Sequence, residues 1–151
     1  QKYSLLELYQ VRLILEEGVI NILARRATQE DTRALEDHLN ALLAKWQEND
    51  NTMGEFTMHL AYAERCGNSY LYTLLKETTT RVMDIIWEGF TGLGGDLSEN
   101  KIENFYNDHI VIIRALEKRD ACKAVMLINK HLSGTIKEIE KASPQIHRQS
   151  F

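Results

Sequence analysis

Residues 102–116, IENFYNDHIVIIRAL, and residues 120–141, DACKAVMLINKHLSGTIKEIEK, decide the fold. In both stretches apolar side chains recur at the three- and four-residue spacing of a helix with one buried face. In the second stretch this face comprises Ala121, Ala124, Val125, Ile128, Leu132, Ile136 and Ile139. Both stretches are therefore predicted to be amphipathic helices that pack against other helices.

The same helical pattern continues through most of the chain. Helices are predicted over about 4–26, 28–47, 53–66, 68–89, 98–118 and 120–141. Ser4 with Glu7 and Thr28 with Asp31 have the spacing of capping boxes, which begin helices. The only proline is Pro144, and no run of β-branched residues bounded by turn residues suggests a strand. We therefore expect an all-α fold, a single antiparallel bundle of six or seven helices.

Length and charge narrow the class of protein. A chain of 151 residues is expected to form one domain, over residues 1–142, followed by a tail at 143–151 that we expect to lack order. Its 18 basic and 22 acidic residues give a net charge of -4, which argues against a nucleic-acid-binding surface. Two cysteines make no disulfide framework, which favours a reduced, cytoplasmic location. No apolar run is long enough for a membrane span.

Three histidines fall on the apolar faces of three predicted helices: His59, His109 and His131. Glu55 lies one turn before His59 and faces the same side of its helix. A buried imidazole or carboxylate needs a partner, and a divalent cation would satisfy all four groups together. Imidazole nitrogens suit zinc and nickel among other metals. Three neutral histidines and one carboxylate leave such a centre with a net positive charge, which favours an anionic ligand such as a small carboxylate.

Simpler interpretations remain open for each of these residues. A histidine on an apolar face is often a hydrogen-bonded core residue, and the bundle would then be a metal-free sensor or scaffold. An open metal site can also activate water, as in a helical metal-dependent hydrolase. The sequence lacks both the HEXXH motif and the paired Glu-x-x-His motifs of di-iron bundles, which argues against an enzyme. His38 lies among charged residues and is expected to be solvated.

Several motifs in order resemble the FCD domain, the C-terminal effector-binding domain of FadR-type regulators in the bacterial GntR family. They are Val11-Arg12-Leu13-Ile14-Leu15-Glu16, then Glu55 and His59 followed by Gly67-Asn68, then Asp108-His109, and finally His131-Leu132. The similarity extends from about Leu8 to Ile139. Glu55 stands where the family usually has Asp, which lengthens that side chain by one methylene.

The resemblance implies a regulator and not an enzyme. In the metal-binding branch of that family, the residues matching Glu55, His59, His109 and His131 hold one divalent metal ion per chain, for which zinc and nickel are the candidates. The resemblance further implies a small organic-acid effector, a homodimer, no membrane partner, and DNA binding only through an N-terminal winged helix-turn-helix domain, which we do not find in this sequence.

Two arginines and an asparagine are weaker candidates for contacts to the effector. Arg81 falls within the apolar stripe of its predicted helix, where it could clamp a carboxylate or form a structural ion pair. Arg12 lies four residues before Glu16, so it could bind the effector or pair with that carboxylate. Asn68 has the position of a helix cap, and its place in the motif puts it among the candidates near the effector.

Overall fold

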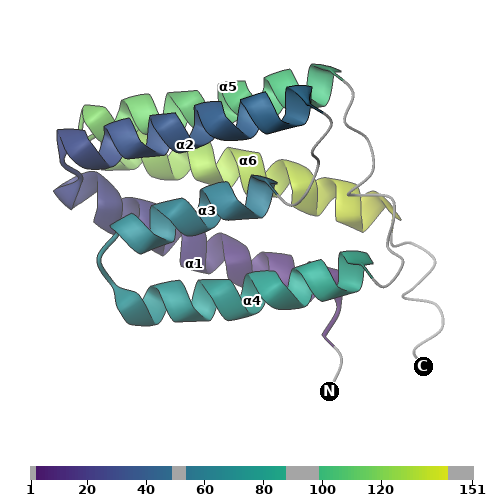
Figure 1. Ribbon diagram of the computed structural model, residues 1–151. Helices are drawn as coiled ribbons and strands as arrows, with labels where there is room; N and C mark the ends of the chain where they lie inside the picture. Colours follow the sequence, from purple (N-terminus) through teal and green to yellow (C-terminus); the bar gives the residue numbers. More distant parts are fainter. Residues whose placement is uncertain (1–2, 49–53, 88–98, 143–151) are drawn as a thin grey trace.

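The computed structural model describes residues 3–48, 54–87 and 99–142, and these residues form helices and no strand. In chain order the helices are α1 (Leu5–Arg26), α2 (Gln29–Gln47), α3 (Gly54–Arg65), α4 (Ser69–Trp87), α5 (Glu99–Glu117) and α6 (Ala121–Ala142) (Figure 1). The predicted all-α fold is confirmed, with six helices in the described ranges. The predicted tail at 143–151 lies outside the described residues. None of the described helices is long and apolar enough to cross a membrane.

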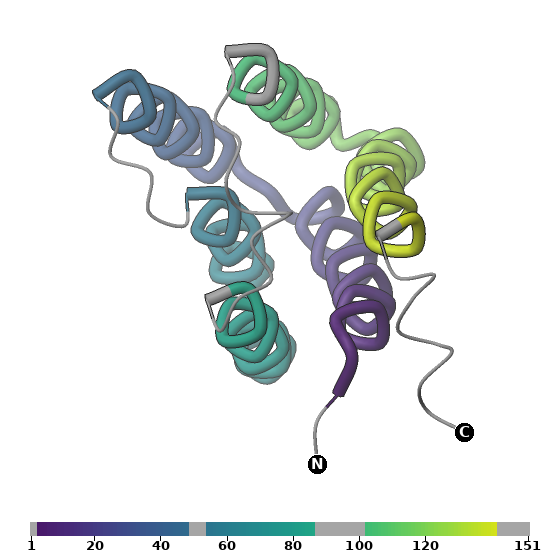
Figure 2. Tube along the Cα trace, turned by 90° about the vertical axis from the view of Figure 1, so that its right-hand side faces the viewer, coloured from purple at the N-terminus to yellow at the C-terminus, as the bar shows by residue number. Residues whose placement is uncertain are grey.

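The helix axes follow one general direction, so Figure 2 shows the helices nearly end-on, with α1 between α6 on one side and α3 and α4 on the other. Helix α1 packs against α3, α4, α5 and α6, whereas α2 packs against α3 and α5. Because it has so many neighbours, α1 buries side chains around much of its circumference, including Arg12 and Glu16. The bundle therefore places two charged residues in its interior, and these residues form part of the candidate site.

Both predicted capping boxes are present. The Ser4 hydroxyl accepts a hydrogen bond from the Glu7 backbone N–H, and the Glu7 carboxylate accepts one from the Ser4 N–H. Thr28 and Asp31 repeat this exchange at the start of α2. Each box satisfies backbone donors that the first turn of a helix leaves unpaired. These local contacts fix where α1 and α2 begin.

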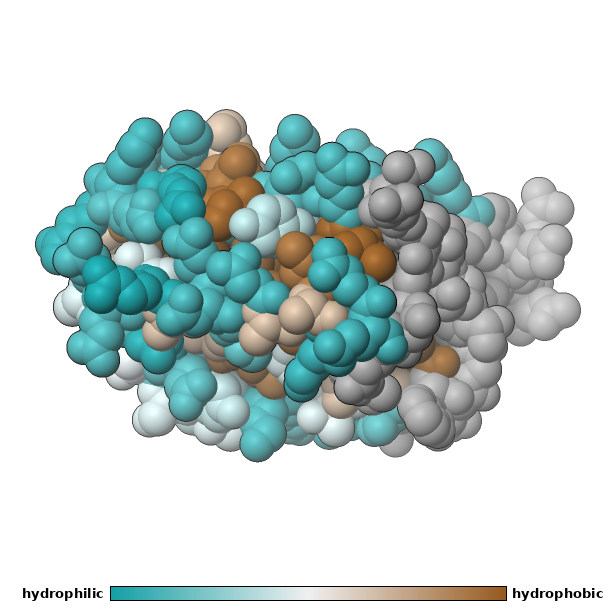
Figure 3. Space-filling view, turned by 45° about the horizontal axis from the view of Figure 1, so that its top comes forward, coloured by the Kyte–Doolittle hydropathy of each residue, from teal (hydrophilic) through white to brown (hydrophobic). Residues whose placement is uncertain are grey.

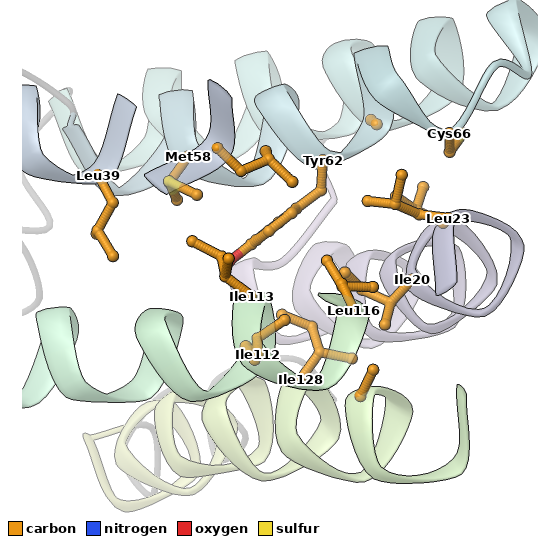
Figure 4. Close-up of a cluster of buried hydrophobic side chains, with 14 of the residues drawn as sticks. Ile20, Leu23, Leu39, Met58, Tyr62, Cys66, Ile112, Ile113, Leu116 and Ile128 are labelled. Atoms are coloured by element: carbon orange, nitrogen blue, oxygen red, sulfur yellow. The ribbon is translucent and has the colours of Figure 1, made fainter. Parts of the chain in front are cut away.

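The main core lies between α1, α2, α3, α5 and α6, with Leu75 from α4 at its edge. Figure 4 shows Met58 and Tyr62 of α3 pointing between Leu39 of α2 and Ile113 of α5. Each fully buried Leu, Ile or Met side chain stabilises the fold by roughly 1.5–3 kcal/mol. Cys66 is fully buried in this core as a free thiol. Outside it, hydrophilic side chains cover most of the coloured part of the face seen in Figure 3.

Gly67 is held in a backbone conformation that an alanine would strain. It has φ +77°, and a Cβ atom there would lie 1.9 Å from Arg26 Nη1, which donates a hydrogen bond to the Cys66 carbonyl. The left-handed conformation alone makes an L-residue less stable by about 1–2 kcal/mol. We therefore expect Gly67→Ala to lower the free energy of unfolding by at least about 1 kcal/mol, measured by urea denaturation.

Gly134 provides the matched control. It lies in α6, and a Cβ atom added there would meet no other atom within 4 Å. Gly134→Ala is therefore expected to stabilise the chain by about 0.5–1 kcal/mol, because alanine favours the helix over glycine. Equal effects of the two substitutions would contradict the conformational argument.

Candidate metal centre

Three histidines from three helices meet in the interior of the bundle. The ring centroids of His59 and His109 are 5.0 Å apart, those of His109 and His131 4.7 Å, and those of His59 and His131 5.3 Å. One ring nitrogen from each histidine lies within 4.8 Å of the others. His59 and His109 are buried, and the His131 side chain is 10% exposed. The structure thus brings together the three histidines that the sequence analysis selected.

The two nitrogens of each imidazole have different surroundings. Every Nδ1 atom has a polar partner, and every Nε2 atom is buried without a hydrogen-bond partner among the described residues. A buried polar atom left unsatisfied makes the fold less stable by about 1–3 kcal/mol. Histidines that bind metals use one nitrogen as the ligand and the other to contact a carboxylate or similar group. Three unsatisfied Nε2 atoms in one cluster therefore fit a bound divalent cation.

His59 is held by a buried ion pair on α1. Its Nδ1 contacts Glu16 Oε2, and Glu16 Oε1 accepts a 2.9 Å hydrogen bond from Arg12 Nε. Burial alone would raise the pKa of Glu16, but the nearby His59 and Arg12 lower it to about 2. Glu16 is therefore a carboxylate that fixes the orientation of the His59 ring. Sequence reasoning treated Glu16 only as a partner for Arg12. The sequence did offer a signal for a buried role of Glu16, because Arg12 and Glu16 are two charged residues among the apolar positions of this helix.

His109 has a neutral partner. The Tyr62 hydroxyl lies 2.9 Å from His109 Nδ1, and both side chains are fully buried. Burial, together with the neighbouring His131, His59 and Arg12, holds the pKa of His109 well below its usual value. A neutral imidazole is the form that binds a metal. When Nδ1–H donates to Tyr62, the Nε2 lone pair faces the cluster. Sequence reasoning assigned no such role to Tyr62.

His131 lies between two carboxylates. Its Nδ1 is 2.9 Å from Asp108 Oδ2, and its Nε2 is 3.7 Å from Glu55 Oε1. Burial alone would lower the pKa of His131, but Asp108 and Glu55 raise it to about 9. Burial likewise opposes ionisation of Glu55, but His131 lowers the pKa of that carboxyl to about 2. The predicted Glu55 ligand therefore lies at the edge of the cluster, in contact with its most exposed histidine.

The three candidate effector contacts lie in different surroundings. Arg12 is fully buried beside Glu16, and its guanidinium carbon lies 4.8 Å and 5.2 Å from the ring centroids of Tyr9 and Phe56. Its Nη1 atom has no hydrogen-bond partner among the described residues. Arg12 is thus both the partner of Glu16 and a donor facing the interior near the centre.

Arg81 and Asn68 are on the outside of the bundle. Arg81, which the pattern placed within the apolar stripe of its helix, is exposed and pairs with Glu77 at 2.9 Å. The Asn68 side chain accepts a hydrogen bond from the Leu71 N–H at the start of α4. No described contact joins either residue to the histidines. His38 is half-buried and lies 3.3 Å from Thr57 Oγ1, so the expectation that it is solvated was only partly right.

Comparison with known proteins agrees with this architecture. The FCD domain family matches residues 7–134. The chain is 28% identical over 134 residues to the Uxu operon transcriptional regulator of Escherichia coli (strain K12). The aligned region covers 83% of this chain and 50% of that protein. It is 24% identical over 136 residues to the HTH-type transcriptional regulator LutR of Bacillus subtilis (strain 168), covering 88% of this chain and 61% of LutR.

A solved structure described as Streptococcus agalactiae GntR superposes with a TM-score of 0.72 at 18% identity. The matched part covers 88% of this chain and 58% of that one, and at this identity the likeness concerns the fold. The chain thus spans about half to three-fifths of the length of these relatives.

Proposed function

Because the chain belongs to the FCD domain family of GntR-type transcriptional regulators, we propose that it is the ligand-sensing domain of such a regulator. In this proposal the domain holds one divalent metal ion, zinc or nickel, and binds a small carboxylate effector. DNA binding belongs to a separate winged helix-turn-helix domain, and two copies of the regulator form a homodimer in the cytoplasm. Effector binding controls DNA binding by favouring one arrangement of that dimer.

The observation that carries the metal proposal is the set of three buried Nε2 atoms that have no hydrogen-bond partner among the described residues. His59, His109 and His131 each keep Nδ1 in a polar contact, which leaves the Nε2 atoms to bind the ion. Glu55, which lies 3.7 Å from His131 Nε2, would supply the fourth ligand. Zinc can expand its coordination from four ligands to five, which would leave one position for an anion. The bound ion would supply positive charge and open coordination positions for an anion.

Arg12 supports a carboxylate effector for an independent reason. It is a buried guanidinium whose Nη1 atom has no hydrogen-bond partner in the described part of the chain, and it lies close to the cluster through its contact with Glu16. Guanidinium groups bind carboxylates through charge-assisted hydrogen bonds, which are about twice as strong as neutral ones. An acid that reached both the metal and Arg12 would satisfy this donor. The exposed positions of Arg81 and Asn68 make them weaker candidates for the same role.

Elemental analysis of the purified chain, expressed as metal per protomer, is the test of this proposal. We expect about one zinc or nickel ion per chain after incubation with either metal, because the site provides one set of ligands. Zero metal would overturn the metal proposal and favour a metal-free sensor or scaffold. Small carboxylates would then be screened by thermal shift with the metal-loaded chain. Conversion of a bound acid to a product would indicate a hydrolase instead.

Tyr62→Phe tests whether the polar partner of His109 matters for metal affinity. The substitution removes only the hydroxyl that contacts Nδ1 and leaves the aromatic ring in the core. Loss of such an outer partner lowers metal affinity by about 10-fold to 100-fold. We expect a loss near the lower limit, measured by competition with a chelator, because the partner is neutral. Tyr106→Phe removes a hydroxyl from α5 for which no contact to the histidines is observed, and it should leave the affinity unchanged. Equal affinities of Tyr62→Phe and wild type would contradict this role.

A further inference from the structure

The walls of the candidate centre differ in how closely they approach water. The His59 and Glu16 side chains are 0% and 3% exposed. On the opposite side, Asp108 is 52% exposed and Glu55 is 39% exposed, with His131 between them at 10%. The cluster is therefore sealed at α1 and approaches the surface on the side where Glu55, Asp108 and His131 lie together.

The sealed walls are held by buried contacts. His59 is fixed by Glu16 and Arg12, neither of which reaches solvent. His109 is fixed by Tyr62 and packs against the ring of Phe105, with the centroids 4.4 Å apart. Moving either histidine would break hydrogen bonds in the interior, where an unsatisfied group makes the fold less stable by about 1–3 kcal/mol.

His131 is held differently. Its polar contacts among the described residues are to Asp108 and Glu55, and both carboxylates are partly exposed. When the ring moves away, water can hydrate the Asp108 and Glu55 carboxylates, whereas Glu16 and the Tyr62 hydroxyl would be left unsatisfied in the interior. Rotation of the His131 ring is consequently the least costly way to open the cluster.

We propose that the metal ion enters and leaves the centre past His131, and that Asp108 sets the rate of entry by attracting the cation and releasing the His131 ring. This inference rests on the proposed metal site and adds a route and a role for Asp108. Two partly exposed carboxylates beside His131 raise the local concentration of a cation and its rate of association. An incoming ion can also exchange some of its water ligands for carboxylate oxygens before it reaches the imidazoles.

The groove beside α3 is not lined by residues of the centre. This groove of about 300 Å³ lies between α2 and α3 and is lined by residues that include His38, Thr57, Glu64 and Arg65. Its lining contains none of the three clustered histidines, Glu16 or Glu55. Met58 and Tyr62, which are fully buried, occupy the inner side of α3. The side of Asp108 and Glu55 is therefore where residues of the centre themselves reach the surface.

The test is the rate of cobalt(II) uptake by the metal-free chain, followed by stopped-flow absorbance. The association rate constant is measured for the wild type, Asp108→Asn, Tyr62→Phe and Glu103→Gln at low and high ionic strength. Glu103 lies on the exposed side of α5, so Glu103→Gln changes the net charge of the same helix by the same amount. Equilibrium stoichiometry and affinity are measured on the same samples.

We expect Asp108→Asn to lower the association rate constant at low ionic strength by about threefold or more, with a smaller difference at high salt. Glu103→Gln should change it much less. Tyr62→Phe should raise the dissociation rate and leave association within about twofold of the wild type, because Tyr62 lies away from the route.

Two results would overturn the route. One is an Asp108→Asn variant that associates as fast as the wild type and loses affinity only through faster dissociation. The other is a Tyr62→Phe variant slowed as much as Asp108→Asn. Either result with one cobalt ion bound per chain would leave the proposed metal site standing. No cobalt bound at equilibrium would instead refute the metal site itself and the route with it.

Discussion

His109→Ala is expected to abolish metal retention, lowering the content from about one ion per chain to nearly none after dialysis. The substitution removes one of three imidazoles that converge from α3, α5 and α6. Loss of an outer partner alone lowers metal affinity about 10-fold to 100-fold, and loss of a direct ligand should exceed that range. Affinity for a carboxylate effector should fall together with metal content. Elemental analysis and thermal shift with candidate acids measure the two effects.

His38→Ala is the matched control for this experiment. His38 is a half-buried histidine on α2 that contacts Thr57 and is absent from the cluster. The His38→Ala variant should retain the metal content and the effector response of the wild type. Circular dichroism of both variants establishes that each is folded before its metal content is interpreted. Full metal content in folded His109→Ala would exclude His109 as a ligand.

The fold could be predicted from sequence because its determinants are local. Capping boxes at Ser4 and Thr28 and the glycine at position 67 mark helix ends through contacts a few residues long. Helical spacing then indicated which faces are apolar, and so which histidines point inward. The predicted helices agree with the observed ones to within a few residues at each end.

The polar partners of the histidines could not be predicted in this way, because each one depends on packing between helices. Glu16 is 43 residues from His59, and Tyr62 is 47 residues from His109. Two ion pairs join oppositely charged residues four apart on one helix, Arg12–Glu16 and Arg81–Glu77, yet the first is buried and the second is exposed. The first is buried because α1 has four neighbouring helices, and the second lies on the outer side of α4.

The position of Glu55 follows from where α3 begins. Gly54 is the first residue of that helix, so Glu55 lies in its first turn, one turn before His59. It approaches His131, whereas Glu16 reaches His59 from the middle of α1. The two carboxylates therefore have different roles in the proposed site. Glu16 orients a ligand from the interior, and Glu55 lies where it can bind the ion from the exposed side.

Glu16→Gln should destabilise the metal-free chain by about 3–5 kcal/mol, the loss expected when one partner of a buried ion pair is removed. The amide keeps the shape of the carboxylate but leaves the fully buried Arg12 guanidinium without a compensating charge. At about 2–4 °C per kcal/mol for a chain of this size, the melting temperature should fall by roughly 6–20 °C. Denaturation in the presence of a chelator measures this effect separately from any loss of metal.

Two further variants test whether the loss of stability in Glu16→Gln comes from the buried charge. They are Glu77→Gln and the double variant that combines Glu16→Gln with Arg12→Met. Glu77→Gln breaks an ion pair of the same spacing whose side chains are 48% and 59% exposed, so its effect should stay below about 1 kcal/mol. If the loss in Glu16→Gln comes from the uncompensated guanidinium, Arg12→Met in that background should restore part of the stability, because it removes the buried charge and keeps an apolar chain. A double variant less stable than Glu16→Gln would show that Arg12 stabilises the fold through its packing with Tyr9 and Phe56 instead.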